Sequence, residues 1–285
     1  MNPGASPFVQ HALADAAATG LDRLDAQMLL LHALGREPHD RAWLLAHDTD
    51  ALSPEVLARF QTTCARRRAG EPVAYLVGHK EFHGLKLSVD ARVLVPRPDT
   101  ETLVDWALEV LAPRAAPRVL DLGTGSGAIA LAIARARPDA QVVAVDASHE
   151  ALDVARANAA QLGLAVELRH GDWLAALGPG DPRPFDLIAS NPPYIEEHDP
   201  HLEALRHEPL SALASGADGL ADLRRIVAAA PAHLAPGGWL LLEHGWNQAG
   251  AVRELLVDAG LTGPVSRRDL AGIERCSGAI RPALG

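Results

Sequence analysis

A short stretch of the sequence, Asn191-Pro192-Pro193-Tyr194, combines an amide, two rigid residues and an aromatic ring directly after an apolar run. An amide nitrogen is a poor nucleophile because its lone pair is delocalised into a planar π system. Two hydrogen-bond acceptors can hold such a nitrogen and support its change toward tetrahedral geometry. The Asn191 side-chain oxygen and the Pro192 carbonyl are candidates, since proline restricts both itself and the residue before it. Tyr194 offers a flat face on which a planar amide or base can stack.

A glycine-rich loop lies upstream, in the segment DLGTGSGAIA at residues 121–130. Gly123, Gly125 and Gly127 let the backbone turn tightly and approach a ligand, although such turns also use glycine for purely steric reasons. Asp146 ends the next apolar run, 23 residues after Gly123. A carboxylate at that position can accept both hydroxyls of a ribose. The pattern therefore indicates a cofactor that contains adenosine.

The spacing of this loop helps to distinguish a dinucleotide from S-adenosyl-L-methionine. Dinucleotide sites usually have the spacing GxGxxG and place a pyrophosphate at a helix N-terminus. Here the spacing is GxGxG, and Asp121 stands two positions before Gly123. A carboxylate there would repel a pyrophosphate but attract an ammonium and a sulfonium, which favours S-adenosyl-L-methionine. Transfer of its methyl group requires no strong general base, because the methylated nitrogen can release its proton afterwards.

The segment GDW at residues 171–173 follows a further apolar run, where the adenine ring of the cofactor would lie. Asp172 or the adjacent backbone could hydrogen-bond the adenine, and Trp173 could pack beside it. A helix cap at Asp172 with Trp173 in the core is an equally good interpretation.

These candidate residues can act together only if helices and strands bring them to the same edge of one sheet. From residue 118 onward, short apolar runs alternate with helical segments, which predicts a parallel sheet covered on both faces. The run FDLIAS delivers Asn191 to the carboxyl edge of that sheet, where open α/β folds bind ligands. Residues 263–280 could add an antiparallel pair.

The N-terminal part of the chain has a different pattern. Residues 6–70 have the spacing of helices, and Ser53 followed by Pro54 marks a helix start. The arginines at 66–68 suit the C-terminal end of that helix, an interpretation we favour over a partner-binding patch. Alternation over residues 82–90 predicts a strand, with 93–95 as its hairpin partner and a helix beginning near Thr100.

Composition narrows the classes of protein. The chain has 285 residues, 48% hydrophobic and 22% charged, with a net charge of −10. That charge opposes broad binding to nucleic acid and favours a protein or small-molecule partner. No apolar run reaches the roughly 20 residues that cross a bilayer, and no secretory signal is visible, so we expect a cytoplasmic protein that does not bind membranes. Cys64 and Cys276 are far apart, and no metal site is expected.

Several motifs together make the chain resemble the S-adenosylmethionine-dependent glutamine N5-methyltransferases that modify peptide chain release factors. They are EPVAYLVGHKEFHGL, VLVPRPDTE, DLGTGSGAIALAIA, FDLIASNPPYI and LLEHGWNQ, within a match over about residues 21–279. The resemblance implies a Rossmann-like class I methyltransferase fold with a mostly parallel seven-stranded sheet. It also implies a helical substrate-recognition domain (1–80), a β-hairpin linker (81–98) and a catalytic domain that binds S-adenosyl-L-methionine (99–285).

The same resemblance assigns roles to individual residues. The cofactor would contact Gly123, Thr124, Gly125, Ser126, Gly127, Asp146, Trp173 and Asn191. Asn191, Pro192, Pro193 and Tyr194 would receive the glutamine of the partner's Gly-Gly-Gln motif, whose methylation modulates translation termination. Arg97 and Glu101 are candidates for lining the site, and Asp99 replaces a more usual glutamate. We expect a monomer apart from the substrate complex.

Other activities fit parts of the same pattern. The catalytic motif alone does not separate release factors from a ribosomal protein as the glutamine substrate, although EPVAYLVGHKEF looks more like the release-factor branch. Methylation of adenine N6 in DNA would need a flipped base and a basic channel, which the acidic chain disfavours. A nicotinamide-linked oxidoreductase or a binding module that only retains the fold are further alternatives.

Overall fold

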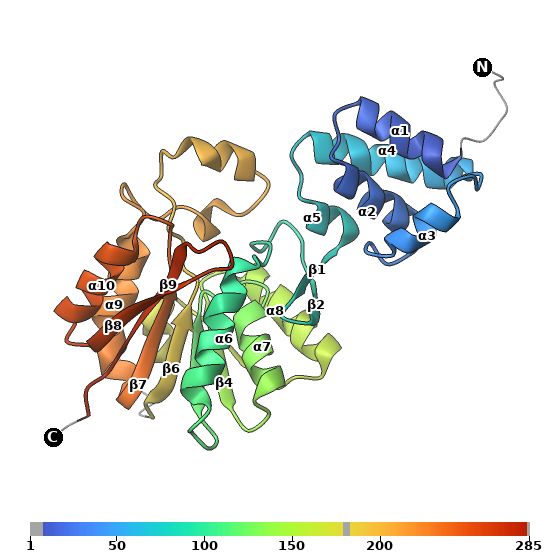
Figure 1. The fold of residues 1–285 in the computed structure, drawn as a ribbon. Helices are drawn as coiled ribbons and strands as arrows, with labels where there is room; N and C mark the ends of the chain where they lie inside the picture. Colours follow the sequence, from blue (N-terminus) through green and yellow to red (C-terminus); the bar gives the residue numbers. More distant parts are fainter. Residues whose placement is uncertain (1–7, 179–182, 284–285) are drawn as a thin grey trace. The chain divides into compact units, whose positions relative to one another are not determined.

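Two separately folded units make up the chain in the computed structural model, which describes residues 8–178 and 183–283 (Figure 1). The first unit is Met1–His79 and the second is Lys80–Gly285. Among the described residues, no helix combines the length and the apolar character needed to cross a membrane.

The first unit is helical, as its sequence pattern predicts. Its helices are α1 (Val9–Ala18), α2 (Arg23–Ala33), α3 (Arg41–Ala46), α4 (Pro54–Arg68) and α5 (Val73–Val77). The Ser53 hydroxyl accepts a hydrogen bond from the Val56 amide at 3.3 Å, which caps α4 as expected. At the other end of α4, Arg66 forms a two-pronged ion pair with Glu71. Arg66 of the arginine run therefore pairs with a carboxylate of its own unit.

The predicted hairpin forms, but with a different partner. β1 (His79–Phe82) pairs with β2 (Leu85–Ser88), whereas residues 93–95 form no strand. The reason lies in the two-residue turn between these strands, where His83 and Gly84 both have positive φ, at 47° and 71°. Such turns match the twist of a hairpin, so they join adjacent strands directly.

The second unit is built on a seven-stranded sheet with the order β5-β4-β3-β6-β7-β9-β8. The strands are β3 (Arg118–Leu122), β4 (Gln141–Asp146), β5 (Glu167–His170), β6 (Phe185–Ser190), β7 (Leu234–Glu243), β8 (Thr262–Arg268) and β9 (Glu274–Ile280). The first five strands of this order pair in parallel, and β9 pairs antiparallel with both β7 and β8. The structure thus confirms the mostly parallel sheet and the antiparallel addition at its end.

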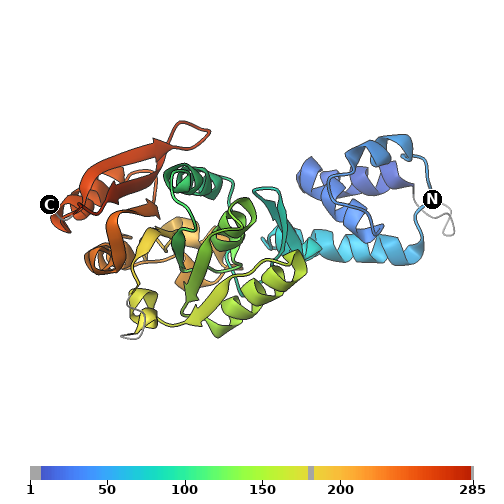
Figure 2. The ribbon, with the colours of Figure 1, turned by 90° about the horizontal axis from the view of Figure 1, so that it is seen from below.

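Helices cover both faces of this sheet, as the view from below shows (Figure 2). They are α6 (Asp99–Leu111), α7 (Ala128–Ala136), α8 (His149–Leu162), α9 (Ala221–His233) and α10 (Ala249–Asp258). Side chains of a strand alternate between faces. Accordingly, Val119 belongs to the core beneath α6 and α7, while its neighbour Leu120 belongs to the core beneath α9 and α10.

The parallel strands place their carboxyl ends at one edge. In the register of the sheet, Leu122 of β3 lies opposite Val145 of β4 and Ser190 of β6. The glycine loop, Asp146 and Asn191 each follow directly on these positions. Segments that are far apart in sequence therefore meet at a single edge, as the predicted fold requires.

Candidate active site

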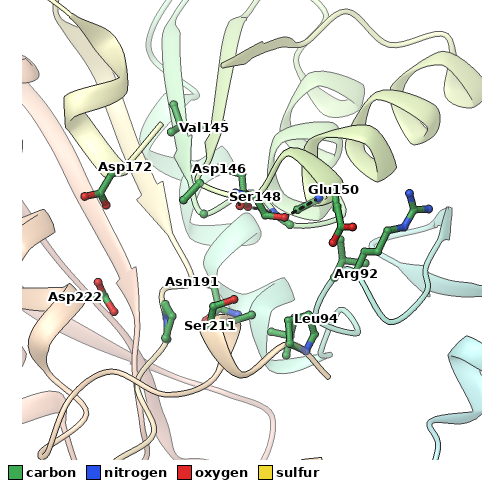
Figure 3. A pocket seen from close by; sticks show the side chains of 18 of the residues that line it. Arg92, Leu94, Val145, Asp146, Ser148, Glu150, Asp172, Asn191, Ser211 and Asp222 are labelled. Atoms are coloured by element: carbon green, nitrogen blue, oxygen red, sulfur yellow. Dashed lines mark hydrogen bonds between the residues drawn. The ribbon is translucent and has the colours of Figure 1, made fainter. Parts of the chain in front are cut away.

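A pocket of about 470 Å³ opens at this edge of the sheet (Figure 3). The loops after β3, β4, β5 and β6 contribute to its wall, together with residues 91–94, Pro209, Ser211 and Ala212. Seven of the residues that we named as candidates from the sequence line it: Gly123, Gly125, Asp146, Asp172, Trp173, Asn191 and Pro193. The geometry therefore brings the glycine loop and the Asn-Pro-Pro-Tyr motif to the same cavity.

Gly123 and Gly125 of the loop line the pocket, and an added side chain would have different surroundings at each. A Cβ at Gly123 would lie 3.0 Å from Cζ3 of the Trp173 ring, so a side chain there would displace the ring. A Cβ at Gly125 would meet no atom within 4 Å, and it would project into open space. Both residues have positive φ, at 71° and 55°, which glycine adopts without strain.

The other predicted residues of the loop shape it from behind. The Thr124 hydroxyl donates to Oδ2 of Asp121 at 2.6 Å, and the Ser126 carbonyl accepts from the Asn158 side chain at 2.9 Å. A Cβ at Gly127 would lie 2.9 Å from Cδ1 of Leu131 at the start of α7. Thr124, Ser126 and Gly127 are not among the residues that line the pocket.

Asp146 ties two loops together at the end of β4. Its Oδ2 atom accepts from the Gly125 amide at 2.8 Å, and its Oδ1 atom accepts from the Ser148 amide at 2.9 Å. A carboxylate has about four lone-pair sites, so acceptor capacity remains for hydroxyl groups in the pocket. This arrangement suits a ribose.

Asp121 is completely buried at the end of β3, and it does not line the pocket. Its Oδ2 atom accepts from the Thr124 hydroxyl and from the Ala130 amide, at 2.6 and 3.2 Å. Its Oδ1 atom has no hydrogen-bond partner among the described groups. Burial therefore raises the pKa of Asp121 from 3.8 to about 7.

Trp173 lies at the start of the 3₁₀ segment η1 (Trp173–Leu177), with its ring against the glycine loop. The preceding Asp172 makes no capping hydrogen bond to this segment and instead forms an ion pair with Arg225. The Trp173 indole N–H donates to Oδ1 of Asp222 at 3.0 Å. Asp222 and Arg225, both from α9, line the pocket, and we did not predict either from the sequence. No motif marks them.

Asn191 presents its side chain to the pocket from the end of β6 (Figure 3). Its Nδ2 atom donates to the Thr100 hydroxyl oxygen at 3.1 Å, so the amide oxygen is left as an acceptor. Pro192 is buried and does not line the pocket, whereas Pro193 does.

Tyr194 is placed behind the pocket wall. It packs against the core beneath α9 and α10, and its hydroxyl donates to Oε1 of Glu243 at 3.4 Å. Its carbonyl oxygen accepts from the Gln248 side chain at 3.0 Å. The ring and the backbone of Tyr194 are therefore both held from within the second unit.

The segment at residues 96–101 braces neighbouring loops. Arg97 donates to Oε1 of the buried Glu208 at 2.5 Å. Glu101 accepts from the His83 amide at 2.9 Å, which supports the hairpin turn. Asp99 lies 3.6 Å from Arg275. Arg97, Asp99 and Glu101 do not line the pocket.

The charge of the pocket bears on what it can hold. Four carboxylates line it, from Asp146, Glu150, Asp172 and Asp222, against the guanidinium groups of Arg92 and Arg225, so the formal net charge of the lining is −2. A negative lining disfavours a pyrophosphate and favours a cationic ligand. The open space at Gly125 and the carboxylates of the lining together fit the adenosine and the sulfonium of S-adenosyl-L-methionine.

Comparisons with known proteins agree with this geometry. Residues 100–215 match the family described as "Methyltransferase small domain", and residues 9–78 match the "PrmC N-terminal domain". The fold is similar to that of a 16S rRNA methyltransferase of T. Thermophilus solved in complex with AdoMet and guanosine. That likeness has a TM-score of 0.52 at 22% identity, over 71% of this chain and 49% of that chain.

Two curated relatives show a closer similarity over nearly the whole chain. A release factor glutamine methyltransferase of Bordetella pertussis is 56% identical over 92% of this chain and 96% of its own length. One from Xylella fastidiosa (strain Temecula1) is 52% identical over 93% of this chain and 95% of its own length. Identity at this level over both units shows that the chain belongs to the release factor glutamine methyltransferase family.

Proposed function

We propose that the protein transfers a methyl group from S-adenosyl-L-methionine to the side-chain amide N5 of the glutamine in the Gly-Gly-Gln motif of peptide chain release factors. The observation that carries this proposal is the Asn191 side chain on the pocket wall, with its NH2 group engaged by Thr100 and its oxygen left as an acceptor. Methylation of this glutamine would modulate translation termination.

Asn191 and Pro192 position the acceptor nitrogen in this mechanism. When bound, the cofactor would supply a methyl group made electrophilic by the sulfonium, and the electrons of the broken S–CH3 bond would stay on sulfur in a neutral thioether. The Asn191 oxygen and the Pro192 carbonyl each accept one N–H of the glutamine amide, so the nitrogen points its developing lone pair at the methyl carbon. Pro193 would complete the binding surface for the glutamine from the pocket wall, and Tyr194, which we predicted to stack on the glutamine, would support that wall from behind. The methylated nitrogen then loses a proton to solvent, and no side chain has to act as a strong base.

The cofactor would be held by Gly123, Thr124, Gly125, Ser126, Gly127, Asp146, Trp173 and Asn191. The structure supports two roles within this set, direct contact with the cofactor and support of the loop. The pocket-lining residues Gly123, Gly125, Asp146, Trp173 and Asn191 are positioned for direct contact. Thr124, Ser126 and Gly127 hold the shape of the loop through the hydrogen bonds and the helix start described above.

The two units would have separate roles. Residues 1–80 would recognise the release factor, residues 81–98 would connect the domains, and residues 99–285 would carry out catalysis. The match of residues 9–78 to the PrmC N-terminal domain supports a separate N-terminal domain in this part of the chain. We further propose a cytoplasmic protein that is monomeric apart from its complex with the release factor, and that binds neither DNA nor membranes directly.

Mass spectrometry of methylated products tests the proposal. Purified protein is incubated with S-adenosyl-L-methionine and, separately, with a release factor, with total ribosomal proteins and with single-stranded and duplex DNA. We expect one added methyl group on the glutamine of the Gly-Gly-Gln peptide and none when that glutamine is replaced by alanine. Methylation of a ribosomal protein or of adenine, with an unmodified release factor, would assign the site to another substrate.

A further inference from the structure

Trp173 has an uncommon backbone conformation at the wall of the pocket. Its φ is +48°, in the left-handed region, and a residue other than glycine stays there only when its surroundings impose the conformation. The ring is confined on one side, because a Cβ at Gly123 would lie 3.0 Å from its Cζ3 atom. The preceding Asp172 makes no capping hydrogen bond to η1, so a helix cap does not secure this position.

Helix α9 supplies two contacts to this position. Oδ1 of Asp222, in the first turn, accepts a hydrogen bond from the Trp173 indole N–H at 3.0 Å. One turn later, Arg225 forms an ion pair with Asp172, the residue directly before Trp173. Asp172 and Asp222 lie on the same side of the pocket (Figure 3). The helix thus holds the tryptophan by its side chain and by its neighbour in the chain.

Exposure to water distinguishes the strength of these two contacts. The side chains of Arg225 and Asp172 are 54% and 56% exposed, and an ion pair that is exposed to this extent contributes little. The Asp222 side chain is only 20% exposed, so water competes less for its hydrogen bond to the indole. Asp222 is therefore the main contact that holds Trp173.

Asp222 is itself fixed by Ser215. The Ser215 hydroxyl donates to Oδ2 of Asp222 at 2.8 Å, and the Asp222 amide donates to the same hydroxyl oxygen at 2.8 Å. Ser215 is 3% exposed, and its amide donates at 2.9 Å to the carbonyl of Ile195, directly after the Asn-Pro-Pro-Tyr motif. Each carboxylate oxygen of Asp222 has a donor of its own. The carboxylate therefore cannot rotate without breaking one of these bonds.

We propose that Asp222 is a positioning residue for the cofactor, which fixes the Trp173 ring against the glycine loop before the cofactor binds. This inference rests on the function proposed above, in which Trp173 contacts the cofactor. Ordering a mobile side chain at a binding site costs affinity, and a ring that is already held avoids this cost. The hydrogen bond from the indole to Asp222 therefore raises the affinity for S-adenosyl-L-methionine.

The negative charge of Asp222 is a second way in which this residue would favour a cationic ligand, because Asp222 lines the pocket. The two effects have different requirements. Attraction needs the charge and does not depend on the indole, whereas positioning needs an acceptor oxygen and the indole N–H. The substitution Asp222→Asn separates them. Its amide keeps an oxygen for the indole, and its NH2 group can donate to the Ser215 oxygen, which has two lone pairs.

Calorimetric titration of the full chain with S-adenosyl-L-methionine measures these effects. Asp222→Ala should weaken binding on the order of 10- to 100-fold, the scale for losing a hydrogen bond to a charged group. Asp222→Asn should stay within about threefold of the wild type, because the acceptor remains. Trp173→Phe keeps a ring but removes the N–H donor. In that background, adding Asp222→Ala should cost no more than about twofold, since the effects of two directly bonded residues do not add.

The matched control is Asp218→Ala, which removes the same charge from the segment just before α9. Asp218 accepts from the Leu220 amide at 3.1 Å and pairs with Arg224, and it does not line the pocket. Its replacement should leave the affinity for S-adenosyl-L-methionine within about twofold of the wild type. A loss of affinity that appears in Asp222→Ala and not in this control comes from the pocket wall.

The Trp173 indole N–H reports the hydrogen bond without turnover. Its ¹H–¹⁵N signal is the one of the five tryptophan signals that is missing in Trp173→Phe. In Asp222→Ala we expect this signal to move upfield and its proton to exchange faster with water. In Asp222→Asn and Asp218→Ala the signal should stay near its wild-type position. A structural role of Asp222 elsewhere in the fold would not move this signal selectively.

Three results would overturn the inference. They are wild-type affinity in Asp222→Ala, a loss in Asp222→Asn as large as in Asp222→Ala, and a loss that is equally large in the Trp173→Phe background. The last two results would assign Asp222 to charge attraction. If Asp222→Ala does not fold, Trp173→Phe decides, since it should weaken binding by about tenfold while Asp222→Asn does not. Wild-type affinity in Trp173→Phe would then refute the positioning role.

The proposed function fails in a different way, with a wild-type protein that binds the cofactor and leaves the release factor unmodified. Calorimetry and the indole signal need no release factor. They therefore judge the role of Asp222 in that event as well.

Discussion

Replacing Asp121 by asparagine should make the free protein more stable at alkaline pH, although the change removes a charge from the predicted cofactor loop. Asp121 is completely buried, and its pKa is raised from 3.8 to about 7. Ionising it inside the fold therefore opposes folding. Asparagine keeps one oxygen for the Thr124 hydroxyl and the Ala130 amide, which are the two donors that Asp121 binds.

The size of the effect follows from the pKa difference. The folded protein binds the Asp121 proton up to about pH 7, whereas the unfolded chain releases it near 3.8. The stabilisation from the protonated group is thus complete below pH 3.8, and it is lost as the pH rises toward 7. Between pH 5 and pH 8 the wild type should lose about 3 kcal/mol that Asp121→Asn retains, since each unit of pKa corresponds to about 1.4 kcal/mol. The NH2 group of asparagine costs about 1–3 kcal/mol if it lacks a partner, but this cost does not depend on pH.

Urea unfolding at pH 5 and pH 8 without cofactor measures this difference. Tryptophan fluorescence follows mainly the second unit, because Trp43 alone of the five tryptophans lies in the first. The control is Asp139→Asn, where the Arg137 guanidinium lowers the pKa of the carboxyl to about 2, outside the measured window. The free-energy difference between wild type and control should stay constant. If the difference between wild type and Asp121→Asn also stays constant from pH 5 to pH 8, Asp121 does not have a raised pKa and the reasoning is wrong.

Three further substitutions test the site. Asn191→Ala should lower kcat by ~10²–10³ while cofactor affinity changes little, because it removes one oriented acceptor from the transition state. Steady-state kinetics measure this loss, and an unchanged kcat would remove Asn191 from the mechanism. Asp146→Ala should mainly weaken binding of S-adenosyl-L-methionine, since it removes the expected ribose acceptor and the partner of the Gly125 amide. Calorimetry that finds equal affinity in the variant would contradict the assignment of Asp146 to the cofactor site. Gly219→Ala should reduce both thermal stability and activity, because the new Cβ would lie 2.2 Å from the Tyr194 carbonyl oxygen and residue 219 has a φ of +69°. A variant with the wild-type melting temperature would show that the motif tolerates this displacement.

Local patterns in the sequence were sufficient to predict the parallel sheet and the edge at which the site forms. Apolar runs, the glycine loop and the positions of Asp146 and Asn191 are read over a few neighbouring residues, and parallel strands necessarily carry their carboxyl ends to one side. The same local reasoning assigned residues 93–95 to the hairpin, where the structure places β1 beside β2. The two positive φ values at residues 83 and 84 decide that pairing, and the segment His83-Gly84 was the signal that could have indicated it.

Other features of the site exist only in the folded chain. Thr100 meets Asn191 across 91 positions, and Tyr194 meets Glu243 across 49. Asp222, likewise 49 positions from Trp173, has no motif of its own. The sequence by itself determined which residue types arrive at the edge of the sheet, because strand and helix periodicity is local. Only the tertiary structure decided which partners stand behind them, since the direction of a hydrogen bond and the burial of a carboxyl depend on contacts between elements that the chain order does not place together.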